Sequence, residues 1–183
     1  MNMNKFRNMS IALALSISAA SAIAQVTVGG ALMYPSKDII DNAVNSKDHT
    51  TLVAAVKAAG LVETLKGPGP FTVFAPTNAA FDALPAGTVD SLLKPESKPA
   101  LTKILTYHVV SGKHDAAELL KEIKAGGGKA SLKTVSGGTL TAMAKGKGIA
   151  VSDEKGGTAT VTIANVIQSN GVIHVVDKVL LPN

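Results

Sequence analysis

The chain has 183 residues, of which 46% are hydrophobic and only 3% aromatic, and it contains no cysteine and no tryptophan. Its formal net charge of +5 comes from scattered lysines, because the sole arginine, Arg7, lies near the N-terminus. The lack of cysteine excludes a disulfide framework and a lipid-modified cysteine. Lysines without arginine or aromatic stacking residues are also a poor match to a nucleic-acid-binding surface.

The first 24 residues have the pattern of a secretory signal peptide. Lys5 and Arg7 precede an apolar stretch from Ile11 to Ala20, and Ala22-Ile23-Ala24 is a small-x-small cleavage site. The apolar stretch is shorter than the ~20 residues that a helix needs to cross a bilayer. We therefore predict that residues 1–24 are cleaved and leave no membrane anchor.

The rest of the chain, residues 25–183, has the length of a single domain. Residues 25–35 form a leader of mostly small residues. We expect an exported monomer that is secreted or periplasmic.

The N-terminal half has helical periodicity. A first amphipathic helix is predicted over Ser36–Asn45 with Ser36 as its N-cap, and a second over Asp48–Ala59, which ends at Gly60. Further short helices are predicted over residues 61–66, 88–93, 99–106 and 115–124.

The stretch Phe71–Phe81, FTVFAPTNAAF, is predicted to organise the core. Alternation of Phe71, Val73 and Ala75 with Thr72 and Phe74 indicates a half-buried strand. Pro76 ends the strand, Thr77 caps the next helix, and Phe81 points inward. Three of the four phenylalanines lie in this stretch, so it carries most of the aromatic core.

The C-terminal part changes to β-branched runs separated by glycine turns. Strands are predicted over residues 130–136, 139–145, 149–153, 158–168 and 172–181. Asn170-Gly171 is a hairpin signal that predicts a type I′ turn with positive φ at both positions. Helices early and a mostly antiparallel sheet late predict an α+β fold.

Candidate chemistry is sparse. The four histidines are far apart in the sequence, and none belongs to a known metal-binding pair. Asp48 and Asp115, each next to a histidine, are predicted as helix caps. We therefore predict no metal, no cofactor and no enzymatic activity. A hydrolase with His108 or His174 as base is the weakest alternative.

Two histidines lie near predicted strands. His174 shares a strand face with Val172 and Val176, so we expect it to be partly buried and hydrogen-bonded. Tyr107 and His108 lie at a helix-to-strand junction, where alternation would place them on opposite faces and leave one of them outside. A structural hydrogen-bonding role for His108 is the other interpretation.

Three motifs, in order, resemble those of the fasciclin domain family: FTVFAPTNAAF at 71–81, TYHVVSG at 106–112 and SNGVIHVVDKVLLP at 169–182. The resemblance extends over nearly all of residues 25–183. It implies a wedge of two mostly antiparallel sheets flanked by a helical cluster from the N-terminal half. The residues of the conserved blocks, with an expected structural role, are Phe71, Phe74, Pro76, Thr77, Asn78, Phe81, Asn170, Gly171 and His174.

The resemblance also implies a function. Family members of this kind are non-enzymatic adhesion modules, and Tyr107 and His108 match the Tyr-His motif implicated in adhesion. The expected partner is a cell-surface or matrix protein or polysaccharide. An Asp-Ile pair linked to integrin recognition in animal members is replaced here by Asn165-Val166. A periplasmic or extracellular small-molecule or lipid carrier is the alternative, and it requires an apolar cavity of about 300 Å³.

Overall fold

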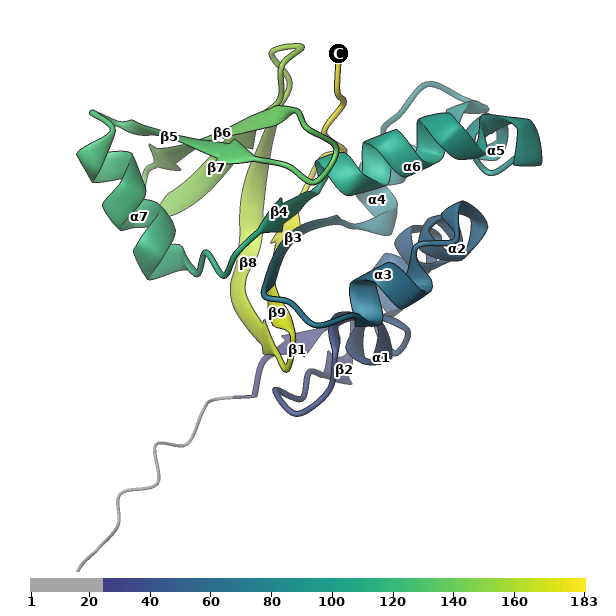
Figure 1. Ribbon diagram of the computed structural model, residues 1–183, viewed down its shortest axis with the longest axis horizontal. Helices are drawn as coiled ribbons and strands as arrows, with labels where there is room; N and C mark the ends of the chain where they lie inside the picture. The colour runs from purple at the N-terminus through teal and green to yellow at the C-terminus, as the bar shows by residue number, and fades with distance from the viewer. Residues whose placement is uncertain (1–24) are drawn as a thin grey trace, which may run out of the picture.

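A seven-stranded mixed sheet forms the centre of the computed structural model, which describes residues 25–183 (Figure 1). The predicted signal peptide lies outside the described residues. The strands are β3 (Phe71–Pro76), β4 (Val109–Ser111), β5 (Lys129–Lys133), β6 (Thr139–Lys145), β7 (Gly148–Ser152), β8 (Thr158–Gln168) and β9 (Gly171–Val176). Their order in the sheet is β4-β3-β9-β8-β7-β6-β5. A separate two-stranded sheet joins β1 (Thr27–Val28) to β2 (Ala31–Leu32).

The large sheet is antiparallel except between β3 and β9, the second and third strands from the β4 edge, which run parallel. The long strand β8 pairs with β7 near its start and with β9 further on, and its register with β9 shifts twice, between Val161 and Val166. These shifts bend the sheet, so β5, β6 and β7 run across the direction of β8 (Figure 1). A bridge between Val110 and Thr134 brings the edge strands β4 and β5 together.

The helices come mainly from the N-terminal half, as predicted. They are α1 (Ile39–Ala43), the 3₁₀ helix η1 (Lys47–His49), α2 (Thr50–Ala59), α3 (Val62–Lys66), α4 (Asn78–Asp82), α5 (Thr88–Leu92), the 3₁₀ helix η2 (Pro95–Ser97), α6 (Lys98–Tyr107) and α7 (Ala116–Ala125). In Figure 1, α1, α2 and α3 lie on one side of β3 and β9, and α7 lies at the far end beside β5.

Two helix starts differ from the prediction. The N-cap of α1 lies two residues later than expected, because Asp38 and not Ser36 caps the helix by accepting a hydrogen bond from the Asp41 amide at 2.8 Å. Helix α2 is preceded by η1, and Asp48 lies within η1 without capping it. The expected stop at Gly60 is confirmed by its left-handed φ of 72°. Asp115 caps α7, also as expected.

Two cores lie on opposite sides of the central strands. The helix-side core packs α1, α2, α3 and α6 against Val73, Ala75, Val109 and Ile173. The strand-side core packs α7 and strands β5 to β7 around Phe74, Tyr107, Val176 and Leu180. Both faces of β3 are thus covered, and the predicted half-buried strand is buried on both faces from Thr72 to Pro76. The α+β class is confirmed.

Candidate functional site

The ring of Tyr107, one of the two predicted adhesion residues, lies inside the strand-side core. Tyr107 is the last residue of α6, and its side chain has no exposed surface. Its hydroxyl donates a hydrogen bond to the carbonyl of Thr139 at 2.8 Å and accepts one from the amide of Glu154 at 3.1 Å. Burial raises the pKa of this hydroxyl. Tyr107 therefore ties the end of α6 to the strands of the opposite part of the sheet.

His108, the second predicted adhesion residue, is buried as well, with 2% of its surface exposed. Its Nδ1 donates a hydrogen bond to the carbonyl of Ile104 at 2.8 Å, and its Nε2 accepts one from the amide of Leu180 at 2.9 Å. These partners require the neutral ring, and burial lowers its pKa to about 4. The ring joins α6 to the C-terminal segment.

The expectation that one residue of this pair faces outward is therefore wrong. Tyr107 ends a helix and His108 caps it, so the alternation of a strand does not apply to them. Neither ring reaches the protein surface, which argues against direct adhesion through them. Both nitrogens of His108 are hydrogen-bonded, which argues against this residue as a catalytic base. The structural interpretation of His108 agrees with its geometry.

His174 lies in the middle of β9 and is fully buried, more completely than predicted. Its ring stacks on Phe74, with ring centroids 5.6 Å apart. Nε2 donates to the carbonyl of His114 at 2.8 Å, and the amide of Asn165 approaches Nδ1 at 3.4 Å. Burial lowers the pKa of His174. With both nitrogens in use inside the core, this ring cannot serve as a base.

The residues that follow β3 join that strand to the N-terminal helices. Thr77 caps α4, as predicted, by accepting a hydrogen bond from the amide of Ala80 at 3.3 Å. The Asn78 side chain accepts from the Thr51 amide at 3.0 Å and donates to the Lys47 carbonyl at 2.8 Å. Phe81 is buried in the helix-side core. Thr77 and Asn78 thus hold α4, η1 and α2 together.

The hairpin between β8 and β9 is present, but its turn is not the predicted type I′. Gln168 pairs with Gly171, so Ser169 and Asn170 form the two-residue loop, and neither Asn170 nor Gly171 has positive φ. Gly171 is needed for a different reason, because an added Cβ would clash with the Phe71 backbone of the parallel neighbour β3. The turn signal predicted the hairpin correctly and the backbone geometry incorrectly.

The side chain of Asn170 connects the last hairpin to the N-terminal helices α1 and α3. Its oxygen accepts a hydrogen bond from the Ile39 amide at 3.1 Å. Its nitrogen donates to the carbonyls of Leu65 and Gly67, at 2.7 and 3.1 Å. Asn170 therefore fastens α1 and α3 to the last hairpin.

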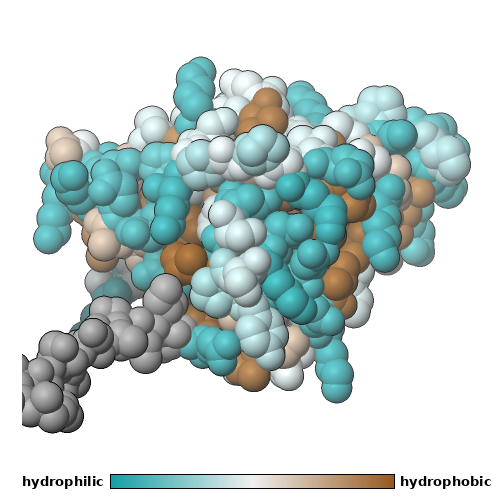
Figure 2. Space-filling view, turned by 60° about the horizontal axis from the view of Figure 1, so that its bottom comes forward, coloured by the Kyte–Doolittle hydropathy of each residue, from teal (hydrophilic) through white to brown (hydrophobic). Residues whose placement is uncertain are grey.

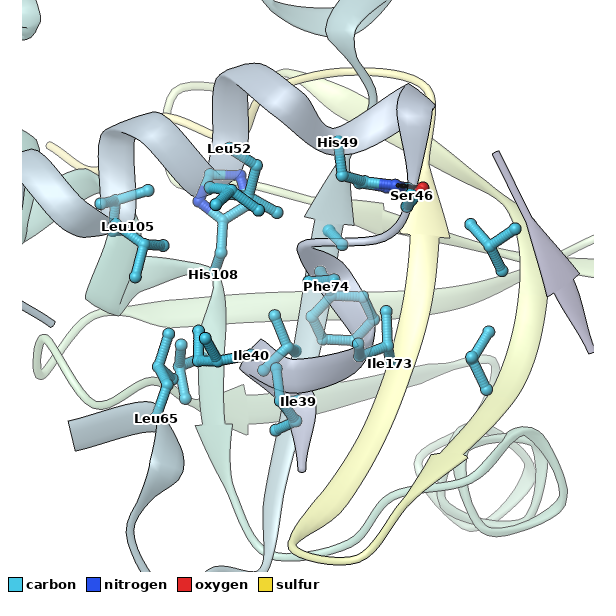
Figure 3. A pocket seen from close by; sticks show the side chains of 18 of the residues that line it. Ile39, Ile40, Ser46, His49, Leu52, Leu65, Phe74, Leu105, His108 and Ile173 are labelled. Carbon is cyan, nitrogen blue, oxygen red and sulfur yellow. Dashed lines mark hydrogen bonds between the residues drawn. The ribbon is translucent and has the colours of Figure 1, made fainter. Parts of the chain in front are cut away.

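A mostly apolar cavity lies in the helix-side core (Figure 3). Its volume is about 50 Å³, within a hollow of about 660 Å³ that includes space open to solvent. Its walls come from α1, α2, α3, α6, β3 and β9, with the side chains of Ile39, Ile40, Leu52, Leu65, Leu105 and Ile173 around it. Three polar residues line it: Ser46, His49 and His108. The sequence did not single out His49 as a site residue, although its place directly before the apolar stripe of α2 was a usable signal.

Within residues 25–183, no group of three or more His, Asp or Glu side chains is arranged to hold a metal ion. In the same part of the chain, no helix is long and apolar enough to cross a membrane.

Residues 47–182 match the family model of the fasciclin domain. The chain belongs to the fasciclin domain family. This match starts at η1 and ends after β9, so it includes Tyr107, His108 and the cavity-lining His49.

Individual relatives agree with this membership. Protein sll1483 of Synechocystis is 54% identical over 144 residues, which are 79% of this chain and 73% of that protein. The cell surface glycolipoprotein MPB83 of Mycobacterium bovis is 34% identical over 145 residues, 76% of this chain and 58% of that protein. A solved FAS1 domain pair from the insect cell adhesion molecule Fasciclin I has the same fold, with a TM-score of 0.70 at 17% identity over 79% of this chain and 51% of that structure.

Proposed function

We propose that this fasciclin domain is a non-enzymatic interaction module that associates with a cell surface or extracellular matrix. The observation that carries the proposal is its family membership, together with relatives described as a cell-surface glycolipoprotein and a cell adhesion molecule. The partner is a surface or matrix protein or polysaccharide. The protein acts after export, as a monomer in the periplasm or outside the cell.

The contact surface has to be sought away from Tyr107 and His108, because both are buried. The described residues include four exposed large hydrophobic side chains: Leu32, Tyr34, Val44 and Val135. The first three belong to β2, the segment after it and the end of α1, which lie together at one end of the molecule (Figure 1). Exposed tyrosine and aliphatic side chains are suited to protein contacts.

The surface around this end is otherwise polar. The face shown in Figure 2 is mostly hydrophilic, with separate hydrophobic spots and no broad apolar area. The Lys37 ammonium lies 5.2 Å from the centroid of the Tyr34 ring, so the tyrosine presents both an aromatic face and a nearby charge. Such a surface fits weak and reversible association.

A binding screen tests this proposal. The purified protein is offered to cell-envelope fractions, polysaccharides and matrix proteins, beside a variant with Leu32→Ser, Tyr34→Ser and Val44→Ser. Val135→Ser is the matched control, because Val135 is equally exposed and lies outside this segment. We expect binding by the wild type and by the control, and a loss of tenfold or more in the triple variant. No binding of the wild type above a folded control protein contradicts the adhesion function.

The alternative of a small-molecule or lipid carrier receives no support for a lipid or a drug-sized molecule, because the cavity of about 50 Å³ is well below the ~300 Å³ that such a carrier requires. A much smaller molecule is a separate case.

A further inference from the structure

His49 has a buried polar atom without a partner. The residue is 3% exposed, and its Nε2 makes no hydrogen bond to any group of the described protein. Native proteins rarely leave a buried polar atom unsatisfied, and a ligand or an ordered water molecule commonly supplies the missing partner. Because His49 lines the cavity of the helix-side core, that partner has space to bind there.

The ring of His49 is held in place from its other side. Ser46, also 3% exposed, lies with its hydroxyl 2.9 Å from Nδ1 of His49 (Figure 3). If the hydroxyl donates to Nδ1, then Nε2 carries the proton and binds an acceptor such as a carbonyl. If Nδ1 donates to the hydroxyl, then Nε2 accepts from a hydroxyl group. In either arrangement Nε2 remains without a hydrogen-bond partner among the described residues.

The other walls of the cavity select for an uncharged and mainly apolar molecule. Among residues 25–183, those that line it include no Asp, Glu or Lys, and both nitrogens of His108 are already occupied. Burial lowers the pKa of His49, an effect that the Ala75 backbone and the Asp48 carboxylate offset only in part. The Ala75 backbone lies close enough to the ring to raise its pKa, although Nε2 forms no hydrogen bond within residues 25–183. A neutral ring among apolar walls disfavours a carboxylate or an ammonium group.

Water alone is a poor occupant of this site. A buried water molecule typically makes about three hydrogen bonds, and apolar cavities stay dry. Here the polar side chains beside the cavity are Ser46, His49 and His108. The Ser46 hydroxyl is bonded to Nδ1 of His49, and both nitrogens of His108 are occupied, so Nε2 of His49 is the one ring nitrogen among them that is left for a water molecule. A molecule with one polar group and an apolar body matches a cavity with one unsatisfied polar atom and apolar walls better than water does.

We propose that this cavity binds a small neutral molecule, or the end of a longer one, that carries a single hydroxyl or carbonyl group. That group bonds to Nε2 of His49, and the carbon atoms fill the space between α1, α2 and the central strands. The proposal is independent of surface adhesion, since Leu32, Tyr34 and Val44 are exposed and are not among the residues that line the cavity.

Small probes test the site in the full protein. Butan-1-ol and butanone are compared with n-pentane, which has the same number of non-hydrogen atoms and no polar group, and with charged butanoate. NMR shifts of the Leu52 and Ile173 methyl groups give the dissociation constants, and the ¹⁵N shift of His49 Nε2 reports the hydrogen bond. We expect saturable millimolar binding of the alcohol and the ketone, roughly fivefold tighter than pentane. We also expect a change in the Nε2 shift and no binding of butanoate.

Two variants distinguish the contribution of the hydrogen bond to probe binding from the contribution of the cavity space. His49→Leu should keep the binding of pentane and remove the preference for butan-1-ol. Ala43→Leu should fill the cavity and abolish the binding of every probe, because Ala43 lines it and is only half-buried. The proposal is overturned if saturating butan-1-ol leaves the Nε2 shift unchanged, or if pentane binds as tightly as the alcohol. It is overturned as well if a water contact at His49 persists in the presence of the alcohol.

Discussion

The buried ring of His108 makes the stability of the domain depend on pH. Its pKa is about 4 in the folded protein and about 6.5 in the unfolded chain, so the unfolded chain binds a proton more readily. The stabilisation is complete above pH 6.5 and is lost as the pH falls toward 4, by about 3 kcal/mol for this residue. Burial also lowers the pKa of His49 and of His174, so protonation of these residues destabilises the folded protein in the same way. Urea unfolding between pH 7.5 and 4.5 measures the effect.

His108→Gln is the matched variant for this measurement. It removes the titrating group and keeps a side chain that can donate and accept hydrogen bonds. We expect a lower stability at pH 7.5 and a flatter pH dependence than in the wild type. Equal pH dependence of both proteins would show that protonation of His108 does not control acid unfolding.

Tyr107→Phe removes a hydroxyl and leaves the packed ring in place. The carbonyl of Thr139 and the amide of Glu154 then lose a buried partner. We expect the free energy of unfolding to fall by about 1–3 kcal/mol, with an unchanged circular dichroism spectrum. A change below about 0.5 kcal/mol would mean that water replaces the hydroxyl. Tyr34→Phe, at an exposed ring, is the control.

The sequence identified Tyr107 and His108 as candidate site residues, but it did not predict that both side chains are buried. Strand alternation is a local pattern, whereas the burial of both rings depends on distant partners such as Leu180 and Thr139. His49 was missed as a site residue for a related reason. Its interest comes from a buried ring nitrogen that no described residue satisfies, and no neighbour in the sequence reveals such an atom.

Strand β9 depends on a glycine at its first residue. In Gly171→Ala the new methyl group would clash with the Phe71 backbone, and the parallel pair β3 and β9 would have to move apart. We expect a loss of about 1–3 kcal/mol in thermal or urea unfolding.

Gly148→Ala is the matched control for this strand. Gly148 also begins a strand, and a Cβ there would have ordinary contact with the nearest atom at 3.7 Å. We expect an effect within about 0.5 kcal/mol. If the two alanine variants are equally stable, close backbone approach is not the reason for the glycine.

Most elements were predictable from periodicity, and their ends were not. The helix predicted over residues 99–106 corresponds to α6, but the structure continues it through Tyr107, which the sequence placed at a helix-to-strand junction. Strand β3 was predicted to be half-buried because Phe71, Val73 and Ala75 alternate with Thr72 and Phe74. The Thr72 hydroxyl is satisfied inside the fold by donating to the Gly112 carbonyl at 2.7 Å, so a polar residue could be buried there.

At the scale of the whole molecule, Asn170 joins segments that are 131 residues apart in the sequence. Asn170→Ala removes the hydrogen bonds to Ile39, Leu65 and Gly67 together. We expect a loss of about 2–4 kcal/mol in the free energy of unfolding and faster amide exchange in α1 and α3.

Asn45→Ala is the control, because Asn45 is exposed and its side chain bonds only to the nearby Asp41 carbonyl. Slow exchange in α1 after Asn170→Ala would show that hydrophobic packing alone holds this helix.

The α+β class and the family followed from the sequence because three motifs lie in order along the chain. The sequence did not predict that the Val110–Thr134 bridge nearly closes the sheet. That closure depends on the bend of β8, which the register shifts produce.

The parallel pair β3 and β9 has a consequence for the order of events during synthesis. A ribosome makes Phe71 long before its partner Gly171, so β3 remains without its central neighbour until the last part of the chain has emerged. The helices made first can form turns in that interval, but they have no complete sheet on which to pack. The domain therefore stays open for most of its synthesis and closes in a late step, when the final strand arrives between two strands that are already made.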